Sequence, residues 1–337
     1  MDEQALKARL PQSLAARTRS LKQNGSVVTA ILDAAGLDAG GRAALEREVH
    51  GALSGVPGVS EVRVALMADR AGPGPAARPS ALRDGGSGPI IVAVGSGKGG
   101  VGKSTLTANL AVALGRLGRK VGLVDADVYG PSQPTLLGTL GQRPESEAEK
   151  LVPIESPYGV KMLSMGHLVE PGRALAWRGP MASGAFGQLV DAHWGDTEIV
   201  LLDLPPGTGD VQITMVQKYR PAGAVIVSTP QDLALIDARR AAELFAQGKV
   251  PVIGLVENMA GYICPHCGGE SDPFGRGGAE AAAAEAGFAF LGRIPLSLSV
   301  REASDAGTPP AAGEGPDAAL FIAIARQVAD WLDGRAG

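Results

Sequence analysis

Residues 95–105, GSGKGGVGKST, combine glycines, lysines and hydroxyls at a spacing that binds phosphate. From Gly97 to Ser104 they satisfy the pattern G-x-x-x-x-G-K-[ST], in which glycines let successive backbone N–H groups point into one concavity. Lys103 is expected to contact the β- and γ-phosphates of a nucleotide, and Ser104 to ligate Mg²⁺. The predicted nucleotide-binding residues of the loop are Gly97, Lys98, Gly99, Gly100, Val101, Gly102, Lys103, Ser104 and Thr105.

Three aspartates follow apolar runs and supply carboxylates for the same site. Asp203 ends the run IVLLDLPPG, whereas Asp125 and Asp127 stand in VGLVDADVYGPS. A carboxylate at the tip of a buried strand can hold Mg²⁺ through water, and phosphoryl transfer needs a group that orients the attacking water. We expect Asp203 and Asp125 near the metal and Asp127 at the water. The alternative is that Asp125 and Asp127 are surface carboxylates that cap a turn. The turn PPGTGD, residues 205–210, is expected to sense the γ-phosphate.

The segments around these residues predict an α/β fold. The run IIVAVGS before the loop is typical of a buried parallel strand. The run STLTANLAVALGRLG after it is typical of a helix whose N-terminus faces the phosphates. Apolar strands and helical segments alternate from residue 89 onward, which predicts a mostly parallel sheet with helices on both faces. The expected strands are IIVAVG, KVGLVDAD, VKMLSMG, EIVLLDLP, AVIVSTP, VPVIGLVENM and AFLGRIP.

Changes in composition divide the chain into three parts. Residues 1–70 are predicted to form a small α+β domain, because GGRAALEREVHGALSGV is typical of an amphipathic helix and EVRVALM alternates like a half-buried strand. Residues 71–88 are rich in Gly, Pro, Ala and Ser, which predicts a linker. Residues 89–337 then form the nucleotide-binding domain.

Cys264 and Cys267, in the sequence CPHC, are the only cysteines of the chain. In a cytosolic protein their spacing favours metal or redox chemistry over a structural disulfide. A [4Fe–4S] cluster is normally held by four thiolates, and a two-fold dimer would bring two from each subunit to one axis. A tetrahedral zinc site satisfies the same count. His266 is a candidate third ligand, although its place between the cysteines fits an outward-facing side chain equally well.

Composition limits the other classes of function. Of the 337 residues, 45% are hydrophobic, 20% charged and 4% aromatic, and the formal net charge is −4. This charge and the scarcity of aromatic residues argue against binding to nucleic acid or to an anionic membrane. No apolar run reaches ~18 residues, the length of a membrane-spanning helix. The N-terminus has no apolar signal core, and Asp2 and Glu3 disfavour a transit peptide, so we expect a cytoplasmic protein.

These motifs together resemble those of two nested families. The loop KGGVGKS resembles that of the deviant Walker A ATPases, which implies that Lys98 reaches the partner's phosphates across a nucleotide-dependent dimer. The resemblance makes Lys98, Lys103 and Asp127 the expected catalytic residues. With CPHC added, residues 89–310 resemble the Mrp/ApbC family of iron–sulfur cluster carriers. The motifs that carry this resemblance are GSGKGGVGKST, DADVYGPS, WRGPM, LLDLPPGTGD, ENMAGYICPHCG and IPLSLSVREASDAG.

The resemblance implies a function and its parts. The chain is expected to bind ATP and Mg²⁺, to hold a [4Fe–4S] cluster at Cys264 and Cys267 between the subunits of a homodimer, and to transfer it to apo iron–sulfur proteins. ATP binding and hydrolysis are expected to gate the dimer. Hydrolysis is expected to be slow because the sequence shows no obvious arginine finger, with Arg178 and Arg301 as the candidates. Asn258 is expected to contact adenine, with a turn-forming role as the alternative. A cluster-assembly scaffold is a further expected partner.

Residues 27–69 resemble only the second half of that family's N-terminal module.

Two other classes of function remain open. A MinD/ParA-type partitioning ATPase with a structural zinc at CPHC would use nucleotide-gated binding to membrane or DNA. The C-terminal segment LFIAIARQVADWL is amphipathic, but its polar side lacks a cluster of Lys and Arg, which favours core packing. An electron-transfer reductase like nitrogenase iron protein would need cysteines from two separated segments, whereas this chain has one pair.

Overall fold

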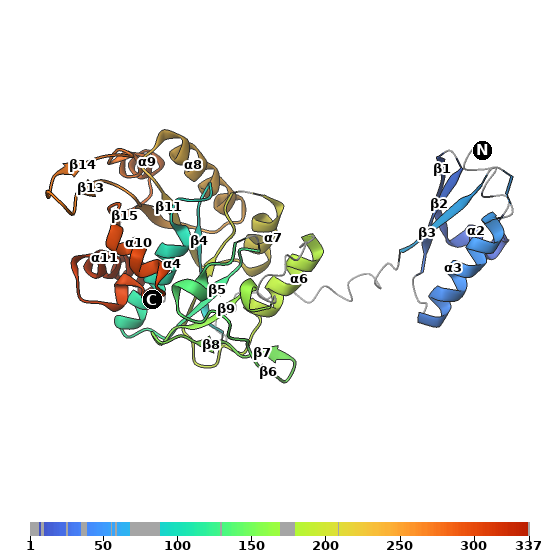
Figure 1. Cartoon of the computed structure of the whole chain (residues 1–337), viewed down its shortest axis with the longest axis horizontal. Coiled ribbons are helices and arrows are strands. Elements are labelled where there is room, and N and C mark those ends of the chain that lie inside the picture. The colour runs from blue at the N-terminus through green and yellow to red at the C-terminus, as the bar shows by residue number, and fades with distance from the viewer. Residues whose placement is uncertain are drawn as a thin grey trace. The chain divides into compact units, whose positions relative to one another are not determined.

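The computed structural model contains two compact units, Met1–Pro79 and Ser80–Gly337 (Figure 1). The residues that it describes are 7, 10–24, 26–34, 39–54, 56–57, 59–67, 88–128, 130–168, 179–207 and 209–335. Apart from Gly88, the predicted linker over residues 71–88 lies outside the described residues. The division of the chain at residues 70 and 88 therefore stays a prediction.

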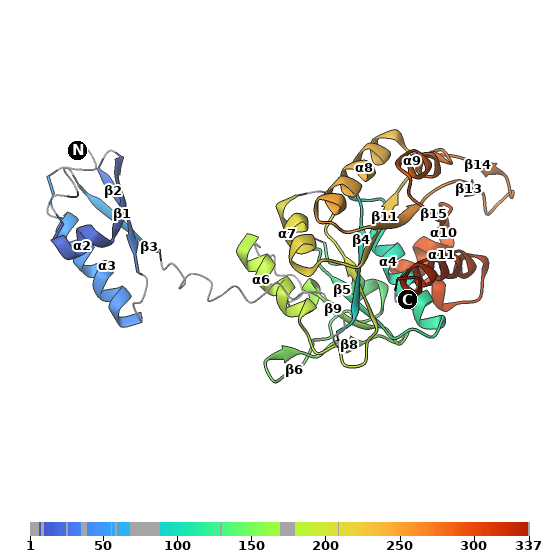
Figure 2. The same ribbon diagram turned by 180° about the vertical axis from the view of Figure 1, so that it is seen from behind.

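The larger unit is built from strands that alternate with helices (Figures 1 and 2). Its strands are β4 (Ile90–Gly95), β5 (Val121–Asp125), β6 (Ser146–Glu147), β7 (Lys150–Leu151), β8 (Ile154–Glu155), β9 (Lys161–Ser164), β10 (Ile199–Asp203), β11 (Gly223–Ser228), β12 (Val252–Glu257), β13 (Tyr262–Ile263), β14 (Glu270–Ser271) and β15 (Phe290–Arg293). Its helices are α4 (Lys103–Arg116), α5 (Gln133–Leu136), α6 (Gly179–Val190), α7 (Asp210–Tyr219), α8 (Asp232–Gln247), α9 (Gly278–Ala286), α10 (Leu298–Asp305) and α11 (Pro316–Asp333), with 3₁₀ turns η1 (Met165–His167) and η2 (Pro310–Ala312).

Eight of these strands form one sheet, in the order β15-β12-β11-β4-β10-β5-β9-β8. Neighbouring strands are parallel, apart from the antiparallel pair β8 and β9. The sheet confirms the expected α/β fold and contains every strand that the sequence predicted from residue 89 onward. Strand β8 was not predicted, because two residues are too few to form a recognisable pattern.

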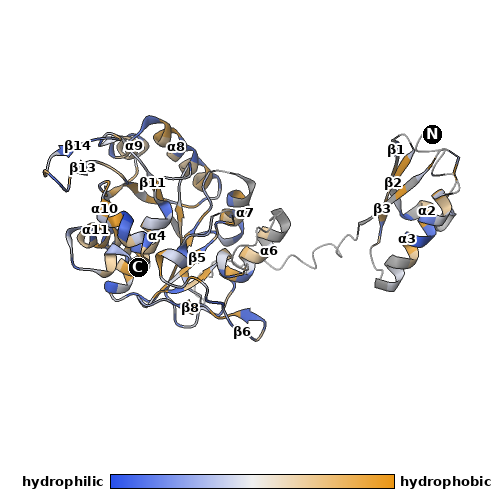
Figure 3. Ribbon diagram, in the orientation of Figure 1, coloured by the Kyte–Doolittle hydropathy of each residue, from blue (hydrophilic) through white to orange (hydrophobic). Residues whose placement is uncertain are grey.

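The sheet separates two hydrophobic cores, because successive side chains of a strand point to opposite faces. On β4, Val92 and Val94 belong to the core beneath α4 and α11, whereas Ala93 belongs to the core beneath α6, α7 and α8. The hydrophobic colours of Figure 3 lie along the strands of this sheet. Phe321 of α11 is buried in the first core. The amphipathic C-terminal segment therefore packs against the sheet, as expected.

Strands β13 and β14 form a separate antiparallel hairpin, residues 262–271, that carries the CPHC sequence. In Figures 1 and 2 this hairpin projects from the rest of the unit. We call it the cysteine hairpin. Among the described residues, no helix is long and apolar enough to cross a membrane.

The smaller unit is a three-stranded sheet packed against a helix. Its elements are α2 (Gln12–Arg17), β1 (Thr18–Asn24), β2 (Val27–Asp33), α3 (Ala39–Ser54) and β3 (Glu61–Met67). The central strand β2 pairs antiparallel with β1 and parallel with β3. Leu32, Val49 and Leu53 are fully buried in its core. Helix α3 and strand β3 confirm the two elements expected here, and β1 and β2 were not predicted.

Candidate functional site

The order of the strands brings the phosphate loop and two aspartates to one edge of the sheet. The loop, residues 96–102, connects the end of β4 to the start of α4. Strand β10 lies between β4 and β5, and its last residue Asp203 is in register with Val94 and with Asp125. Ligands of parallel α/β sheets bind at this carboxyl edge. Helix α4 begins at Lys103, so the free backbone N–H groups of its first turn face this carboxyl edge.

A buried ion pair joins the loop to β10. Lys103 Nζ contacts Asp203 Oδ1 and also donates to Ser104 Oγ over 3.2 Å. Thr107 Oγ1, one turn further along α4, donates to the same Asp203 oxygen over 3.1 Å. Lys103 and Asp203 are 6% and 0% exposed. The lysine that would bind phosphate is therefore held by the carboxylate that would hold the metal.

Asp125 is the second buried carboxylate of this site. It accepts hydrogen bonds from the backbone N–H groups of Asp127 and Gln133, each over 3.1 Å, and from Ser164 Oγ over 3.0 Å. Burial, and after it the neighbouring charge of Asp203, raise the pKa of Asp125 to about 7. Two buried carboxylates thus face one buried ammonium group. This surplus of oxygen ligands and negative charge fits Mg²⁺.

The raised pKa of Asp125 predicts that the metal-free protein loses stability as the pH rises. The folded state keeps the proton to about pH 7, whereas an unfolded chain releases it near 3.8. The stabilising contribution is therefore complete below the lower value and is lost as the pH rises through the higher one. We expect Asp125→Asn to lack this loss, measured by urea unfolding in EDTA between pH 5 and 8. Parallel pH profiles of the two proteins would contradict the prediction.

Gln133 is a residue of the site that the sequence did not reveal. Its Nε2 donates to Asp203 Oδ2 over 2.8 Å and to the Ser104 carbonyl over 2.9 Å, while its backbone N–H binds Asp125. The side chain is fully buried, and its Oε1 has no hydrogen-bond partner among the described residues. Gln133 therefore fixes both carboxylates with respect to the loop. Its one local signal was a polar side chain after the DADVYGPS sequence.

Gly97 allows α8 to pack directly on the loop. A Cβ at this position would lie 2.0 Å from the backbone carbonyl carbon of Asp237 in α8. Besides its place in the phosphate loop, this glycine therefore permits close contact between helix and loop. Gly102, which has a φ of 82°, is similarly close to Asn258. A Cβ at Gly102 would lie 2.1 Å from the Asn258 Nδ2.

The contact at Gly97 predicts a large effect from one added methyl group. We expect Gly97→Ala to destabilise the protein by about 1–3 kcal/mol, the usual cost of overpacking. Gly99→Ala is the matched control, because its Cβ would meet its nearest neighbour, Pro206, at an ordinary 3.8 Å. Thermal unfolding of both variants measures the difference. Equal melting temperatures would show that α8 does not rest on the loop.

A cavity of about 620 Å³ opens beside the end of the loop. Gly102, Ser104 and Thr105 line one side of it, and Asn258, Met259 and Tyr262 line another. We call it the P-loop cavity. Its volume suits a nucleoside. Asn258 Nδ2 donates to the Val101 carbonyl over 2.9 Å, so this residue lies against the loop as well as the cavity. Its contact with adenine stays a prediction.

The cysteine hairpin holds its two thiols close together. Cys264 donates its backbone N–H to the Gly269 carbonyl over 3.0 Å, and Gly268 donates to the Cys264 carbonyl over 2.8 Å. The backbone N–H of His266, and then the N–H and thiol of Cys267, lower the pKa of the Cys264 thiol. Cys267 is exposed and Cys264 half-buried. A thiolate that is accessible in this way is suited to bind soft metals.

His266 does not complete a three-ligand site. Among the described residues, no group of three or more His, Cys, Asp and Glu side chains could hold a metal ion. The described residues therefore offer the cysteine pair alone as soft ligands at this hairpin.

The remaining predicted residues lie around the loop with different surroundings. Lys98 is half-buried, and its carbonyl accepts a hydrogen bond from Ser96 Oγ over 3.0 Å. Asp127 is half-buried and accepts from the Gly130 N–H over 3.2 Å. Gly207, in the turn expected to sense the γ-phosphate, donates to the Ser96 carbonyl over 3.1 Å. The catalytic roles of Lys98 and Asp127 stay predictions.

Of the two candidate arginine fingers, Arg301 lies among the described residues. Arg301 lines the P-loop cavity and pairs with Asp305 and Glu302 on its own helix. Arg178 lies outside the described residues.

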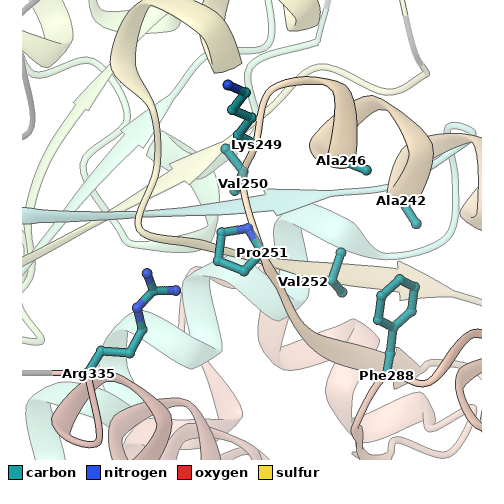
Figure 4. Close-up of a pocket in the computed structure, with 8 residues that line it drawn as sticks. All are labelled: Ala242, Ala246, Lys249, Val250, Pro251, Val252, Phe288 and Arg335. Atoms are coloured by element: carbon teal, nitrogen blue, oxygen red, sulfur yellow. The ribbon is translucent and has the colours of Figure 1, made fainter.

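A second hollow, of about 460 Å³, lies at the opposite edge of the sheet, where β12 begins (Figure 4). Val250, Pro251, Val252 and Phe288 provide most of its apolar lining, and Lys249 and Arg335 are its charged residues. None of the described residues that line it carries a carboxylate, hydroxyl or thiol. The chemistry-bearing residues therefore gather at the carboxyl edge and in the cysteine hairpin.

Comparison with known proteins agrees with this arrangement. The family model described as ParA, NUBPL iron-transfer P-loop NTPase, matches residues 89–329. An iron-sulfur cluster carrier protein of Pseudomonas fragi is 49% identical over 240 residues, which are 70% of this chain and 83% of the relative. A protein of the same name from Deinococcus radiodurans is 44% identical over 295 residues, 86% of this chain and 81% of the relative.

A plant relative and two solved structures extend the comparison. The iron-sulfur protein required for NADH dehydrogenase, mitochondrial, of Arabidopsis thaliana is 51% identical over 65% of this chain and 70% of its own length. A nucleotide-binding protein of Archaeoglobus fulgidus, solved in complex with ADP, is 38% identical with a TM-score of 0.60, over 69% of this chain and 91% of that one. The cell division ATPase MinD of Pyrococcus furiosus, 23% identical with a TM-score of 0.55 over 72% and 99%, shares the fold.

Proposed function

The chain belongs to the family of ParA-type NUBPL iron-transfer P-loop NTPases, and on this premise we propose that it binds iron–sulfur clusters and transfers them to apo-proteins. The observation that carries the proposal is the exposed cysteine hairpin, with its close thiol pair and lowered Cys264 pKa, on the unit that contains the phosphate loop. The names of the bacterial relatives support the cargo.

We further propose that the cargo is a [4Fe–4S] cluster held between two copies of the chain. Four thiolates hold such a cluster, and Cys264 and Cys267 supply two of them. A two-fold axis near the hairpin doubles the count without any other ligand.

Exposed apolar side chains support this homodimer. Ile263 stands next to Cys264, and Leu298 lines the P-loop cavity. Leu233 and Ile236 lie in the first turns of α8, the helix that packs on the loop at Gly97. Large hydrophobic side chains left in water beside a functional site are typical of an interaction surface.

On the nucleotide side, the buried ion pair is the element that ATP changes. Lys103 exchanges Asp203 for the β- and γ-phosphates, and Asp203 becomes available to hold Mg²⁺ together with Asp125 and Ser104 Oγ. When bound, Mg²⁺ supplies charge that the phosphates need for transfer. Asp127 orients the attacking water, and Lys98 contacts the phosphates of the partner subunit. Slow hydrolysis agrees with an Arg301 that is engaged by two carboxylates.

ATP gates the carrier by shifting the population of dimer geometries. A ligand favours the state with which it makes more contacts. The γ-phosphate contacts of Lys98, Asp127 and the turn at residues 205–210 favour the closed dimer, and hydrolysis removes them. We also propose that the recipients are apo-proteins and that an assembly scaffold is a partner. The proposed location is the cytoplasm, although one relative is named for the mitochondrion.

Anaerobic reconstitution with iron and sulfide tests the function. We expect about four irons and four sulfides per dimer, the content of one [4Fe–4S] cluster, with a brown protein whose visible absorption is lost on transfer to an apo-ferredoxin. Zinc is measured in the same samples. A colourless protein with stoichiometric zinc and no transfer would instead favour a partitioning ATPase with a structural zinc site.

A further inference from the structure

We propose that Tyr262 is a positioning residue that couples nucleotide in the P-loop cavity to the geometry of the cysteine hairpin. The proposal rests on the proposed function, because it names how the nucleotide acts on the cluster site. It assigns the coupling to a short stretch of chain, residues 258–264, that runs from the phosphate loop to the first thiol.

The stretch begins at the loop itself. Asn258 follows β12 directly and donates its Nδ2 to the Val101 carbonyl of the loop over 2.9 Å, while its backbone N–H binds the Ser228 carbonyl over 2.8 Å. Cys264 is only six residues further on. The two functional sites are thus joined by a few peptide units rather than through the body of the sheet.

The stretch is folded against residues 294–296. Ala260 donates to the Ile294 carbonyl over 3.0 Å, and Leu296 donates to the Gly261 carbonyl over 2.8 Å. Met259 and Gly261 have φ angles of 58° and 76°, so the chain turns sharply twice. A non-glycine residue in the left-handed region is held there by its surroundings. The path is therefore a defined conformation that can transmit a displacement.

Tyr262 belongs to both sites at once. It lines the P-loop cavity together with Met259, and it forms a parallel bridge with Leu296. It is also the first residue of β13, paired with Ser271 across the hairpin. A base that enters the cavity therefore adds contacts to the side chain at the root of the cysteine hairpin.

The cysteine hairpin is the part most able to respond. Its strands are joined by the ladder pairs Tyr262–Ser271 and Ile263–Glu270 and by the hydrogen bonds of Cys264 with residues 268 and 269, and its tip is exposed. Isolated two-stranded hairpins are marginally stable, so their local opening costs little. Contacts made by nucleotide at Tyr262 shift this opening equilibrium toward the closed hairpin. The geometry of the thiols then depends on whether the cavity is filled.

Hydrogen exchange of the full-length protein with and without Mg·ADP tests the coupling. ADP fills the cavity but lacks the γ-phosphate that would close the dimer. The experiment therefore measures the effect of nucleotide on the hairpin separately from the effect of dimer closure. We expect Mg·ADP to slow exchange in residues 262–271 by roughly threefold to tenfold, the range of one aromatic contact. In Tyr262→Ala at saturating Mg·ADP, that slowing is lost.

Two matched variants control the experiment. Ile263→Ala changes the next residue, which is 60% exposed and does not line the cavity, so it keeps the slowing. Tyr262→Phe retains the aromatic ring, so Mg·ADP should still slow exchange in this variant. This control remains informative even if Tyr262→Ala opens the hairpin without nucleotide. Bound Mg·ADP without slower exchange in the wild type, or full slowing in Tyr262→Ala, would overturn the proposal.

A second readout uses the cluster-loaded protein. The rate of iron release to a chelator should depend on Mg·ADP in the wild type and be independent of it in Tyr262→Ala, with the iron content of both unchanged. If the wild type takes up no cluster, the carrier function fails while the exchange experiment still decides the coupling.

Discussion

Lys103→Ala is expected to lose ATP binding by at least about 100-fold while cluster uptake continues. In the proposed complex the lysine donates charge-assisted hydrogen bonds to two phosphates, each worth about 1.5–3 kcal/mol. The side chain of Lys103 donates hydrogen bonds to Asp203 and Ser104, and neither residue belongs to the cysteine hairpin. Fluorescent-nucleotide titration measures the first effect, and iron content after reconstitution measures the second. Equal loss of both would show that the two sites are not separable.

The same substitution should destabilise the empty protein, because it leaves Asp203 and Asp125 buried without their ammonium partner. Removing one member of a buried ion pair costs about 3–5 kcal/mol. Adding Asp203→Asn to Lys103→Ala removes the uncompensated charge, so the double variant should regain much of the melting temperature and still not bind ATP. Recovery of ATP binding in the double variant would contradict the phosphate role of Lys103.

The second large effect concerns the thiols. Either Cys264→Ala or Cys267→Ala should reduce the iron of the reconstituted dimer from about four atoms to near zero, since two remaining thiolates cannot hold a cluster that needs four. Both variants remain folded, because the cysteines lie on the exposed hairpin away from the two cores of the unit.

His266→Ala is the matched control for the thiols. It alters the same loop but keeps both sulfurs, so iron and sulfide should stay at wild-type values. Loss of all iron in His266→Ala, or retention of half the iron in a single cysteine variant, would show that the ligand set differs from four shared thiolates.

The sequence predicted the nucleotide site where its signals are local. The loop from Gly97 to Ser104 is contiguous, and Asp125 and Asp203 each end an apolar run, so strand order alone brings them together. The CPHC spacing identified both thiols for the same reason. Each of these features is contained within a dozen residues, and the order of strands in the parallel sheet brings the loop and the aspartates together.

Contacts between distant segments could not be predicted in this way. Gln133 binds the Ser104 carbonyl and Asp203, which are 29 and 70 positions away in the chain. Gly97 approaches Asp237 of another helix. Strand β1, TRSLKQN, contains one large apolar residue, Leu21, so its pairing with β2 left no pattern. Such features depend on packing, which one sequence does not display.

The buried trio of Lys103, Asp203 and Asp125 links the filling of the nucleotide site to acidity. With a pKa of about 7, Asp125 carries a proton in a large share of empty molecules near neutral pH. If Asp125 holds Mg²⁺ as we propose, the bound cation would favour the ionised carboxylate and displace that proton. Filling and emptying the site would then exchange protons with the surroundings. On this proposal, mildly acidic conditions favour the empty site and mildly alkaline conditions favour the loaded one.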